Sequence, residues 1–164
     1  MFNKICVLGC GLIGSSLLRA IEKKKLAKEI NAFDKSTEVS SYLEKNFSFK
    51  VTKSIDEAVK DSDLVIISSP LSSYKEILLS IKLSLKKKVI LTDTGSVKKE
   101  VNKMINNLNL NDVNWIASHP IAGTEFSGPE AGFAQLFEKR WCILSADKNI
   151  PNEEIRKLEK FWLE

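Results

Sequence analysis

The sequence contains a single histidine, His119, whose neighbours are unusual for a purely structural side chain. It stands in the segment SHPIAGTEFSGPEAG, residues 118–132, directly before a proline and ahead of three glycines. A free imidazole titrates at about pH 6.5, so at neutral pH it can accept a proton from a substrate hydroxyl. Oxidation of an alcohol by hydride transfer needs such a base. The alternative is that His119 only caps a turn through backbone hydrogen bonds, which is the commoner role of a lone histidine.

A second cluster, GCGLIG, matches the glycine pattern of a phosphate-binding turn. The pattern assigns Gly9 to the tight turn, Gly11 to the close approach of a pyrophosphate and Gly14 to helix packing. We expect backbone N–H groups at the start of the next helix, around Leu12 and Ile13, to bind the pyrophosphate, because a helix N-terminus carries about half a positive charge. The pattern is weak by itself and depends on its context.

Asp34 supplies that context, because it stands twenty residues after Gly14 at the end of an expected strand. A carboxylate there accepts hydrogen bonds from the adenosine ribose and repels a ribose phosphate, so the site favours NAD. Lys35 and Ser36 follow directly and keep NADP possible. The structural alternative is a tight glycine turn with a surface acid.

Hydrophobic patterning places these residues between alternating strands and helices. The expected strands cover residues 4–9, 29–34, 64–67, 88–93, 114–120 and 140–146. The expected helices cover residues 12–25, 36–45, a short segment capped by Ser54, 72–85, 97–108 and a capped helix at 151–164. Continuous apolar strands separated by helices indicate a parallel sheet covered on both faces. The sequence therefore predicts a doubly wound, mostly parallel α/β domain of the Rossmann type.

In such a sheet the carboxyl ends of the strands meet at one edge, where ligands bind. Three expected strands end there in polar or turn residues, namely SSP at 68–70, TDTGS at 92–96 and SHPIAG at 118–123. We therefore expect Ser96 and His119 to lie near a nicotinamide. Ser96 could also cap the helix expected from Val97, and the two roles are compatible.

Three segments, GLIGSSLLRAI, DTGSVK and SHPIAGTEFSGPEAG, closely resemble the cofactor-binding half of the prephenate and arogenate dehydrogenases of tyrosine biosynthesis. The resemblance implies an NAD(P)-dependent oxidoreductase that couples hydride loss from a cyclohexadienol to decarboxylation. It assigns His119 to polarising the substrate hydroxyl, and Ser96 to sharing that hydroxyl and orienting the imidazole. The remaining residues that it assigns are Gly123, Thr124 and Glu125 in a loop facing the substrate, and Ser69 and Pro70 near the cofactor.

Length, net charge and cysteine content argue against a nucleic-acid-binding, metal-binding or membrane protein. The 164 residues suit one domain, 1–164, and a net charge of +4 is too small to imply nucleic acid. The lysine triplets at 23–25 and 86–88 each end a helical segment, where cations suit the helix dipole and stay solvated. Three cysteines without paired spacing predict no metal site and a reducing compartment. No charged leader is present and no apolar run approaches about 18 residues, so we expect a cytoplasmic protein with no membrane contact.

The resemblance also implies parts that the chain does not contain. In the family a helical domain follows, supplies the dimer interface and carries an arginine for the substrate carboxylate. This chain ends at Glu164, and its arginines, Arg19, Arg140 and Arg156, lie outside the matched loops. We therefore expect either a fragment or an anchor from another polypeptide, with a homodimer only when the C-terminal domain is present.

Two other functions fit the same residues. The first is a Rossmann dehydrogenase for another small hydroxy acid, which a catalytic lysine on a following helical domain would identify. The second is a nucleotide-sensing module without catalysis. Nothing in the sequence separates prephenate from arogenate as substrate.

Overall fold

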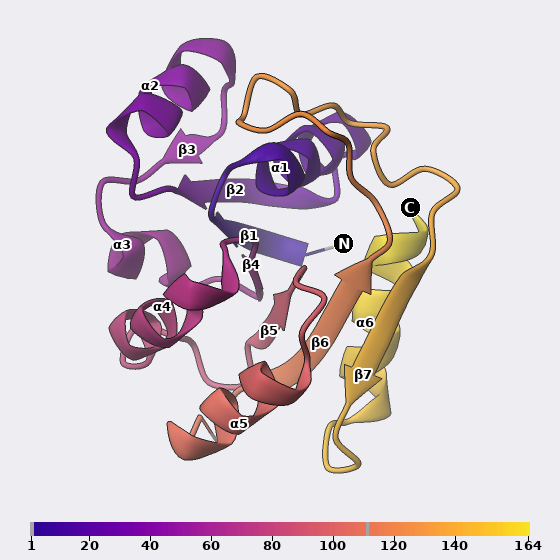
Figure 1. Cartoon of the computed structure of the whole chain (residues 1–164). Coiled ribbons are helices and arrows are strands. Elements are labelled where there is room, and N and C mark those ends of the chain that lie inside the picture. The colour runs from indigo at the N-terminus through magenta and orange to yellow at the C-terminus, as the bar shows by residue number, and fades with distance from the viewer. Residues whose placement is uncertain (1, 111) are drawn as a thin grey trace.

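The protein is built on a seven-stranded sheet with the strand order β3-β2-β1-β4-β5-β6-β7 (Figure 1). The computed structural model describes residues 2–110 and 112–164. The strands are β1 Phe2–Leu8, β2 Ala27–Phe33, β3 Lys50–Val51, β4 Leu64–Ile67, β5 Ile90–Asp93, β6 Asn114–Pro120 and β7 Cys142–Ala146. Every neighbouring pair from β3 to β6 is parallel, and β7 alone runs antiparallel to its neighbour β6. The expected mostly parallel sheet is confirmed.

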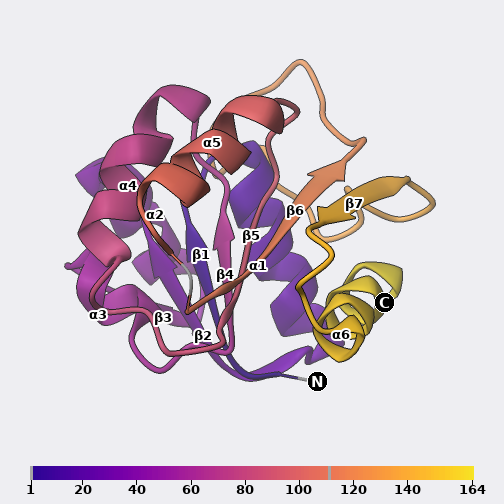
Figure 2. The same cartoon turned by 90° about the horizontal axis from the view of Figure 1, so that it is seen from below.

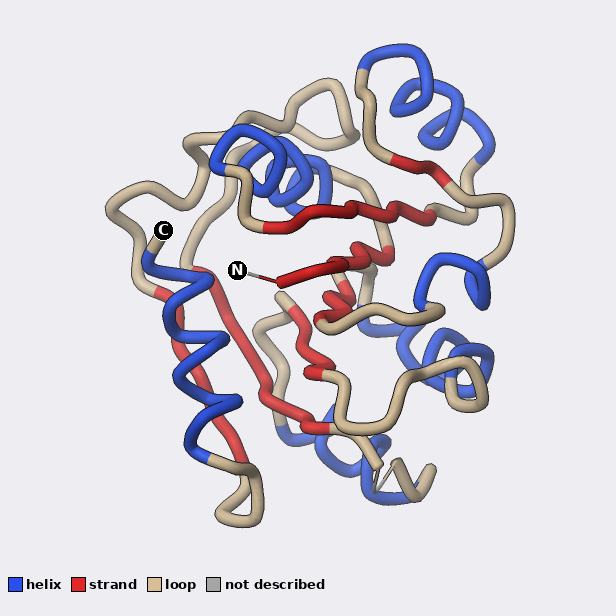
Figure 3. Tube along the Cα trace, turned by 180° about the vertical axis from the view of Figure 1, so that it is seen from behind, coloured by secondary structure: helices blue, strands red, loops and turns tan. Residues whose placement is uncertain are grey.

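In the described residues, six α-helices connect and cover the strands. They are α1 Leu12–Lys24, α2 Thr37–Asn46, α3 Ile55–Val59, α4 Tyr74–Ile81, α5 Lys99–Asn107 and α6 Asn152–Leu163. Side chains of α3, α4 and α5 pack in one buried cluster with one face of the sheet, and those of α1, α2 and α6 pack with the other face (Figure 2). Seen from behind, α6 runs beside β6 and β7 (Figure 3). The fold is therefore doubly wound.

The two clusters explain why β4, and the buried part of β1 at residues 5–8, are apolar at every position. In β1, Cys6 and Leu8 belong to the cluster of α3, α4 and α5, whereas Ile5 and Val7 belong to the other. Successive side chains of a strand point to opposite faces, so burial on both sides removes the polar alternation of a half-exposed strand. Cys6 and Cys10 are buried unpaired thiols, and burial raises the pKa of both well above the usual range.

Two expected helix caps are confirmed, whereas other helix and strand ends differ from those expected. Ser36 and Ser54 cap α2 and α3 by accepting hydrogen bonds from the Val39 and Glu57 N–H groups. The expected cap of the last helix is wrong, because Pro151 occupies that position and makes no side-chain hydrogen bond to the helix. The segment Leu71–Ser73 is a short 3-10 helix before α4. The strand β3 was not predicted, because two residues are too few to show a hydrophobic pattern.

Candidate functional site

The glycine turn follows β1 and opens α1, and the surroundings of its three glycines differ. Gly9 has a φ of +88°, and a Cβ there would overlap the Ser69 hydroxyl. A Cβ at Gly14 would overlap the Gly9 carbonyl oxygen, so this position allows α1 to approach the turn. A Cβ at Gly11 would meet no atom within 4 Å. Gly11 therefore faces open space, and the packing of the protein itself does not require a glycine there.

The start of α1 is free of the groups that usually satisfy a helix N-terminus. Gly11 is the capping residue, no side chain caps the helix, and the first turn contains no acidic residue. The N–H groups of the first turn, which no side chain caps, and the positive end of the helix dipole thus remain available to an anion that approaches over Gly11.

Asp34 follows β2 and is held against the glycine turn. Its Oδ2 accepts a hydrogen bond from the Cys10 N–H at 2.7 Å, and its Oδ1 accepts one from the Ser36 N–H at 2.9 Å. The carboxylate is therefore fixed in orientation by the backbone on both sides. The glycine pattern does not reveal the bond to Cys10.

A hollow of about 350 Å³ lies between the glycine turn, the end of β2 and the corner after β4. It brings together the predicted residues Gly9, Gly11, Asp34, Lys35, Ser69 and Pro70. Its apolar lining includes Val39, Ile55 and Ile77, from helices on the two sides of the sheet. Sequence analysis missed these three because their periodicity marks a helix face without showing whether that face meets the core or a ligand.

His119 and Ser96 lie at the same edge of the sheet, as predicted from the parallel pairing of β5 with β6. His119 is half-buried in β6 opposite Ile143 of β7, and Ser96 is exposed in the turn after β5. No hydrogen bond joins the two side chains in the part of the chain that the structure describes. Ser96 does not cap α5 either, since that helix begins at Lys99 and its capping position is Lys98. That alternative for Ser96 is wrong.

Lys98 instead points inward, to a carboxylate that the motif analysis did not single out. Its Nζ donates to Asp93 Oδ1 at 2.6 Å and to the Ser118 carbonyl oxygen at 2.5 Å. Asp93 is fully buried and also accepts hydrogen bonds from the Ser118 N–H and the Tyr74 hydroxyl. Burial raises the pKa of Asp93 and lowers that of Lys98, and the attraction between the two opposes both shifts.

This ion pair joins the ends of β5 and β6 directly before Ser96 and His119. Ser118 also shares a 2.6 Å hydrogen bond with Thr92, and its hydroxyl accepts a bond from Trp162 Nε1 at 3.2 Å. The main chain that carries His119 is thereby held by β5, by the turn before α5 and by α6. The available signal in the sequence was an acid, Asp93 of DTGSVK, at the end of a strand that is mostly apolar.

The loop from Ile121 to Trp141, called the 121–141 loop below, follows His119. Its two ends are joined by a hydrogen bond from the Ile121 N–H to the Trp141 carbonyl oxygen at 2.8 Å. Gly123, Thr124 and Glu125 are exposed in its first part. The apolar side chains next to His119 are also open to solvent, with Trp141 85% and Ile143 58% exposed.

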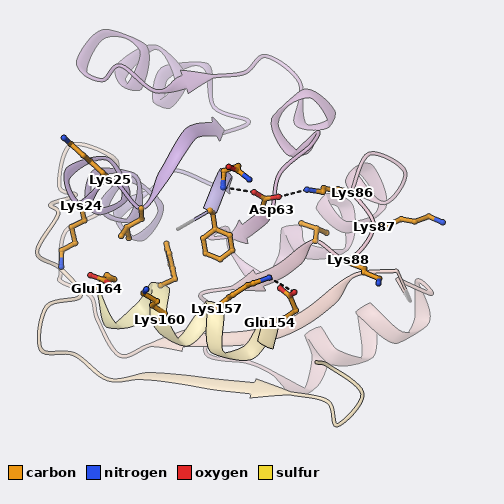
Figure 4. Close-up of a pocket in the computed structure, with 15 residues that line it drawn as sticks. Lys24, Lys25, Asp63, Lys86, Lys87, Lys88, Glu154, Lys157, Lys160 and Glu164 are labelled. Carbon is orange, nitrogen blue, oxygen red and sulfur yellow. Dashed lines mark hydrogen bonds and ion pairs between the residues drawn. The ribbon is translucent and has the colours of Figure 1, made fainter. Parts of the chain in front are cut away.

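A second hollow, of about 600 Å³, lies where the strands begin, away from the glycine turn. Lysines from both triplets line it, but Figure 4 shows Lys25 and Lys87 directed away from its centre. Lys86 pairs with Asp63 at 2.7 Å, and Lys157 pairs with Glu154 at 3.0 Å. These lysines behave as solvated or paired surface charges.

In residues 2–110 and 112–164, no helix is both long and apolar enough to cross a bilayer. The same residues contain no group of three or more histidine, cysteine or acidic side chains placed to hold a metal ion.

The known proteins to which this chain is similar include prephenate and cyclohexadienyl dehydrogenases. A family model described as the nucleotide-binding domain of prephenate dehydrogenase matches residues 17–164. A cyclohexadienyl dehydrogenase from Zymomonas mobilis is 38% identical over all of this chain and 56% of its own length. A prephenate dehydrogenase from Lactococcus lactis is 32% identical over 96% of this chain and 44% of its own length. The chain thus spans about half the length of these relatives.

Solved structures agree with the fold. A prephenate dehydrogenase from A. aeolicus, in complex with hydroxyphenyl propionate and NAD+, superposes with a TM-score of 0.86 at 25% identity. The match covers 99% of this chain and 57% of that one. An arogenate dehydrogenase from Synechocystis has the same fold, with a TM-score of 0.86 at 21% identity. With a family model that matches residues 17–164, the chain belongs to the family of prephenate dehydrogenase nucleotide-binding domains.

Proposed function

We propose that this chain binds NAD(H) in the hollow between the glycine turn and Asp34. The carrying observation is Gly11, whose missing side chain leaves open space beside an uncapped helix N-terminus. A pyrophosphate would accept hydrogen bonds from the N–H groups of Leu12 and Ile13, and Asp34 would accept bonds from the adenosine ribose. The relative from A. aeolicus was solved with NAD+, which supports the same cofactor here.

Asp34 favours NAD over NADP in this proposal. Its carboxylate is fixed by two backbone N–H groups and cannot turn away easily from a phosphate on the ribose. Lys35 lines the same hollow, so its ammonium group is the feature that would favour NADP instead. Titrating the chain with NADH and NADPH by nicotinamide fluorescence separates the two. Tenfold tighter binding of NADPH, about 1.4 kcal/mol, would contradict the role of Asp34.

The activity we propose for the complete protein is oxidative decarboxylation of prephenate or arogenate. Bound NAD+ supplies the hydride acceptor. The hydride leaves the carbinol carbon of the substrate, the bond to the ring carboxylate breaks to release carbon dioxide, and the electron pair of that bond completes the aromatic ring. The relatives' names and the position of His119 at the carboxyl edge of the sheet support this activity.

His119 would accept the proton of the substrate hydroxyl as the hydride departs, which is general-base catalysis. Ser96 would share that hydroxyl from the neighbouring turn, and the exposed Gly123, Thr124 and Glu125 would face the substrate. Ser69 and Pro70 would contact the cofactor from the corner after β4. The bonds of Ser118 to Lys98 and Asp93 hold the strand end from which the imidazole projects.

We further propose that the complete active site and a homodimer need a helical C-terminal domain. None of the arginines, Arg19, Arg140 and Arg156, lies in the segments at the carboxyl edge that carry Ser96 and His119. The exposed apolar side chains of Trp141 and Ile143 beside His119 fit a surface that another part of the enzyme covers. The test is to measure turnover of prephenate and arogenate by this chain with and without that domain.

A further inference from the structure

We propose that Ser16 and Gly132 are positioning residues that fix the 121–141 loop to the nucleotide-binding helix α1. The proposed role is to make nucleotide binding and ordering of the substrate-facing segment depend on each other. This inference rests on the proposed binding of NAD(H) at the glycine turn.

The first observation is a hydrogen bond between segments 117 residues apart. The Phe133 N–H donates to Ser16 Oγ at 3.1 Å, and Ser16 Oγ donates in turn to the Leu12 carbonyl oxygen at 2.7 Å. Ser16 is fully buried in the first half of α1. One hydroxyl therefore connects the backbone of the loop to the first residue of the helix whose N–H groups would hold the pyrophosphate.

The second observation is the close approach of Gly132. A Cβ at this position would overlap Ser15 Oγ, and it would lie 2.8 Å from Arg19 Nη1 and 3.1 Å from the Ser16 backbone nitrogen. A larger residue here would have to displace the Ser15 and Arg19 side chains, because the loop backbone lies directly on α1. In Figure 1 the loop passes over α1 before the chain enters β7.

The two halves of the loop differ in their support. Beyond Gly132, Leu136 is buried, and Phe137 packs edge-on against Trp162 of α6 with ring centroids 5.8 Å apart. Before Gly132, the segment with Thr124 and Glu125 is exposed, and Phe126 is 66% exposed. The anchor at Ser16 and Gly132 thus lies between the packed second half of the loop and the exposed residues 123–127, with the buried Pro129 between those residues and the anchor.

A bound pyrophosphate would restrain the first turn of α1, which includes Leu12. Because Ser16 bonds to Leu12 and to Phe133, that restraint reaches the loop without any contact between nucleotide and loop. Linkage then requires the reverse effect, so a loop held against α1 strengthens nucleotide binding by the same factor.

Hydrogen exchange measured by mass spectrometry on the 164-residue chain tests the anchor and the coupling together. Without nucleotide, S16A should speed exchange in peptides spanning residues 121–133 roughly two- to tenfold, the effect of losing one hydrogen bond. Saturating NADH should slow exchange of these peptides in the native chain and slow it less in S16A. S16T retains the hydroxyl and should restore the native pattern.

S15A is the matched control, since Ser15 is the next residue of α1, is equally buried and also donates to the Leu12 carbonyl oxygen, at 3.3 Å. Among the described residues Ser15 accepts no hydrogen bond from the loop and only packs against Gly132, so exchange in residues 121–133 should rise less in S15A than in S16A. G132A should speed exchange there as S16A does, while melting within a few degrees of the native chain.

Three results would overturn the inference. One is NADH binding that leaves exchange of residues 121–133 unchanged in the native chain, which would leave the proposed nucleotide site standing. A second is native exchange in S16A with and without NADH. The third is no NADH binding by the native chain, which would remove the nucleotide site as well as the coupling.

Discussion

The glycine turn and the surroundings of His119 lie at the same edge of one sheet and differ in how complete they are. At the turn, Gly9, Gly14 and Asp34 are each fixed by contacts within the chain, and the hollow already has apolar walls. Around His119, the main chain is anchored by Lys98, but Trp141 and Ile143 are exposed. The difference supports the proposal that the chain forms the nucleotide site by itself and supplies only part of the reaction site.

The largest effect expected from this difference is on turnover. Residues 1–164 alone should bind NADH and show negligible dehydrogenase activity, because positioning of the substrate can supply roughly 7 to 11 kcal/mol of a barrier. The measurement is NADH formation with prephenate and with arogenate, before and after the C-terminal domain of a relative is fused or added. Robust turnover by this chain alone would show that the reaction site is complete.

Within the complete enzyme, H119N should lower turnover by about 10²- to 10⁴-fold, the usual effect of losing a general base. Asparagine keeps much of the shape and a hydrogen-bonding group but cannot take the proton. NADH affinity, measured by fluorescence on the isolated chain, should hardly change, because His119 does not line the nucleotide hollow. A variant with near-native turnover would remove His119 from the mechanism.

Loss of the ion pair between Lys98 and Asp93, which holds the main chain before His119, should strongly lower the stability of the protein. K98M leaves the fully buried Asp93 without its cation, and loss of one partner of a buried ion pair costs about 3 to 5 kcal/mol. Urea unfolding measures the loss in free energy of unfolding. The double variant K98M/D93N should regain part of it, because no buried charge remains.

The pH dependence of K98M follows from the raised pKa of Asp93. Without Lys98 this pKa should rise further, so the folded state binds a proton that the unfolded chain has released. The stability of K98M should therefore fall as pH rises from the unfolded pKa of an aspartate, about 4, through the raised folded value. A deficit relative to the native chain that is independent of pH would show that Asp93 is not left as a buried charge.

The smallest effect distinguishes two glycines of the same turn. G11A should leave the free energy of unfolding within about 0.5 kcal/mol, since its Cβ meets no atom within 4 Å. It should still weaken NADH binding at least tenfold, about 1.4 kcal/mol, if a pyrophosphate occupies that space. G14A is the contrast, since its Cβ overlaps the Gly9 carbonyl oxygen and should cost about 1 to 3 kcal/mol of stability. Native NADH affinity in G11A would place the phosphates elsewhere.

The sequence by itself determined the order of the longer elements and the edge of the sheet at which the predicted residues Asp34, Ser96 and His119 lie. Apolar runs, Ser36 and Ser54 as caps, and the spacing from Gly14 to Asp34 are signals contained within a few neighbouring residues or one βαβ unit. Both kinds of signal are local in the sequence: a tight turn needs glycine at particular positions, and a strand buried on both faces is a continuous apolar run. The strand β3 has only two residues, which is too short to show any pattern of alternating or continuous apolar residues, so the sequence did not predict it.

Only the tertiary structure decided which polar groups meet across the fold. Lys98 looks in the sequence like one more surface lysine, yet its Nζ turns inward, because β5 and β6 bring Asp93 and the Ser118 carbonyl oxygen to it. Ser16 and Phe133 meet although 117 residues separate them. Such contacts depend on the packing of strands and helices that are distant along the chain, and no local pattern of residues records which buried donor will find which acceptor.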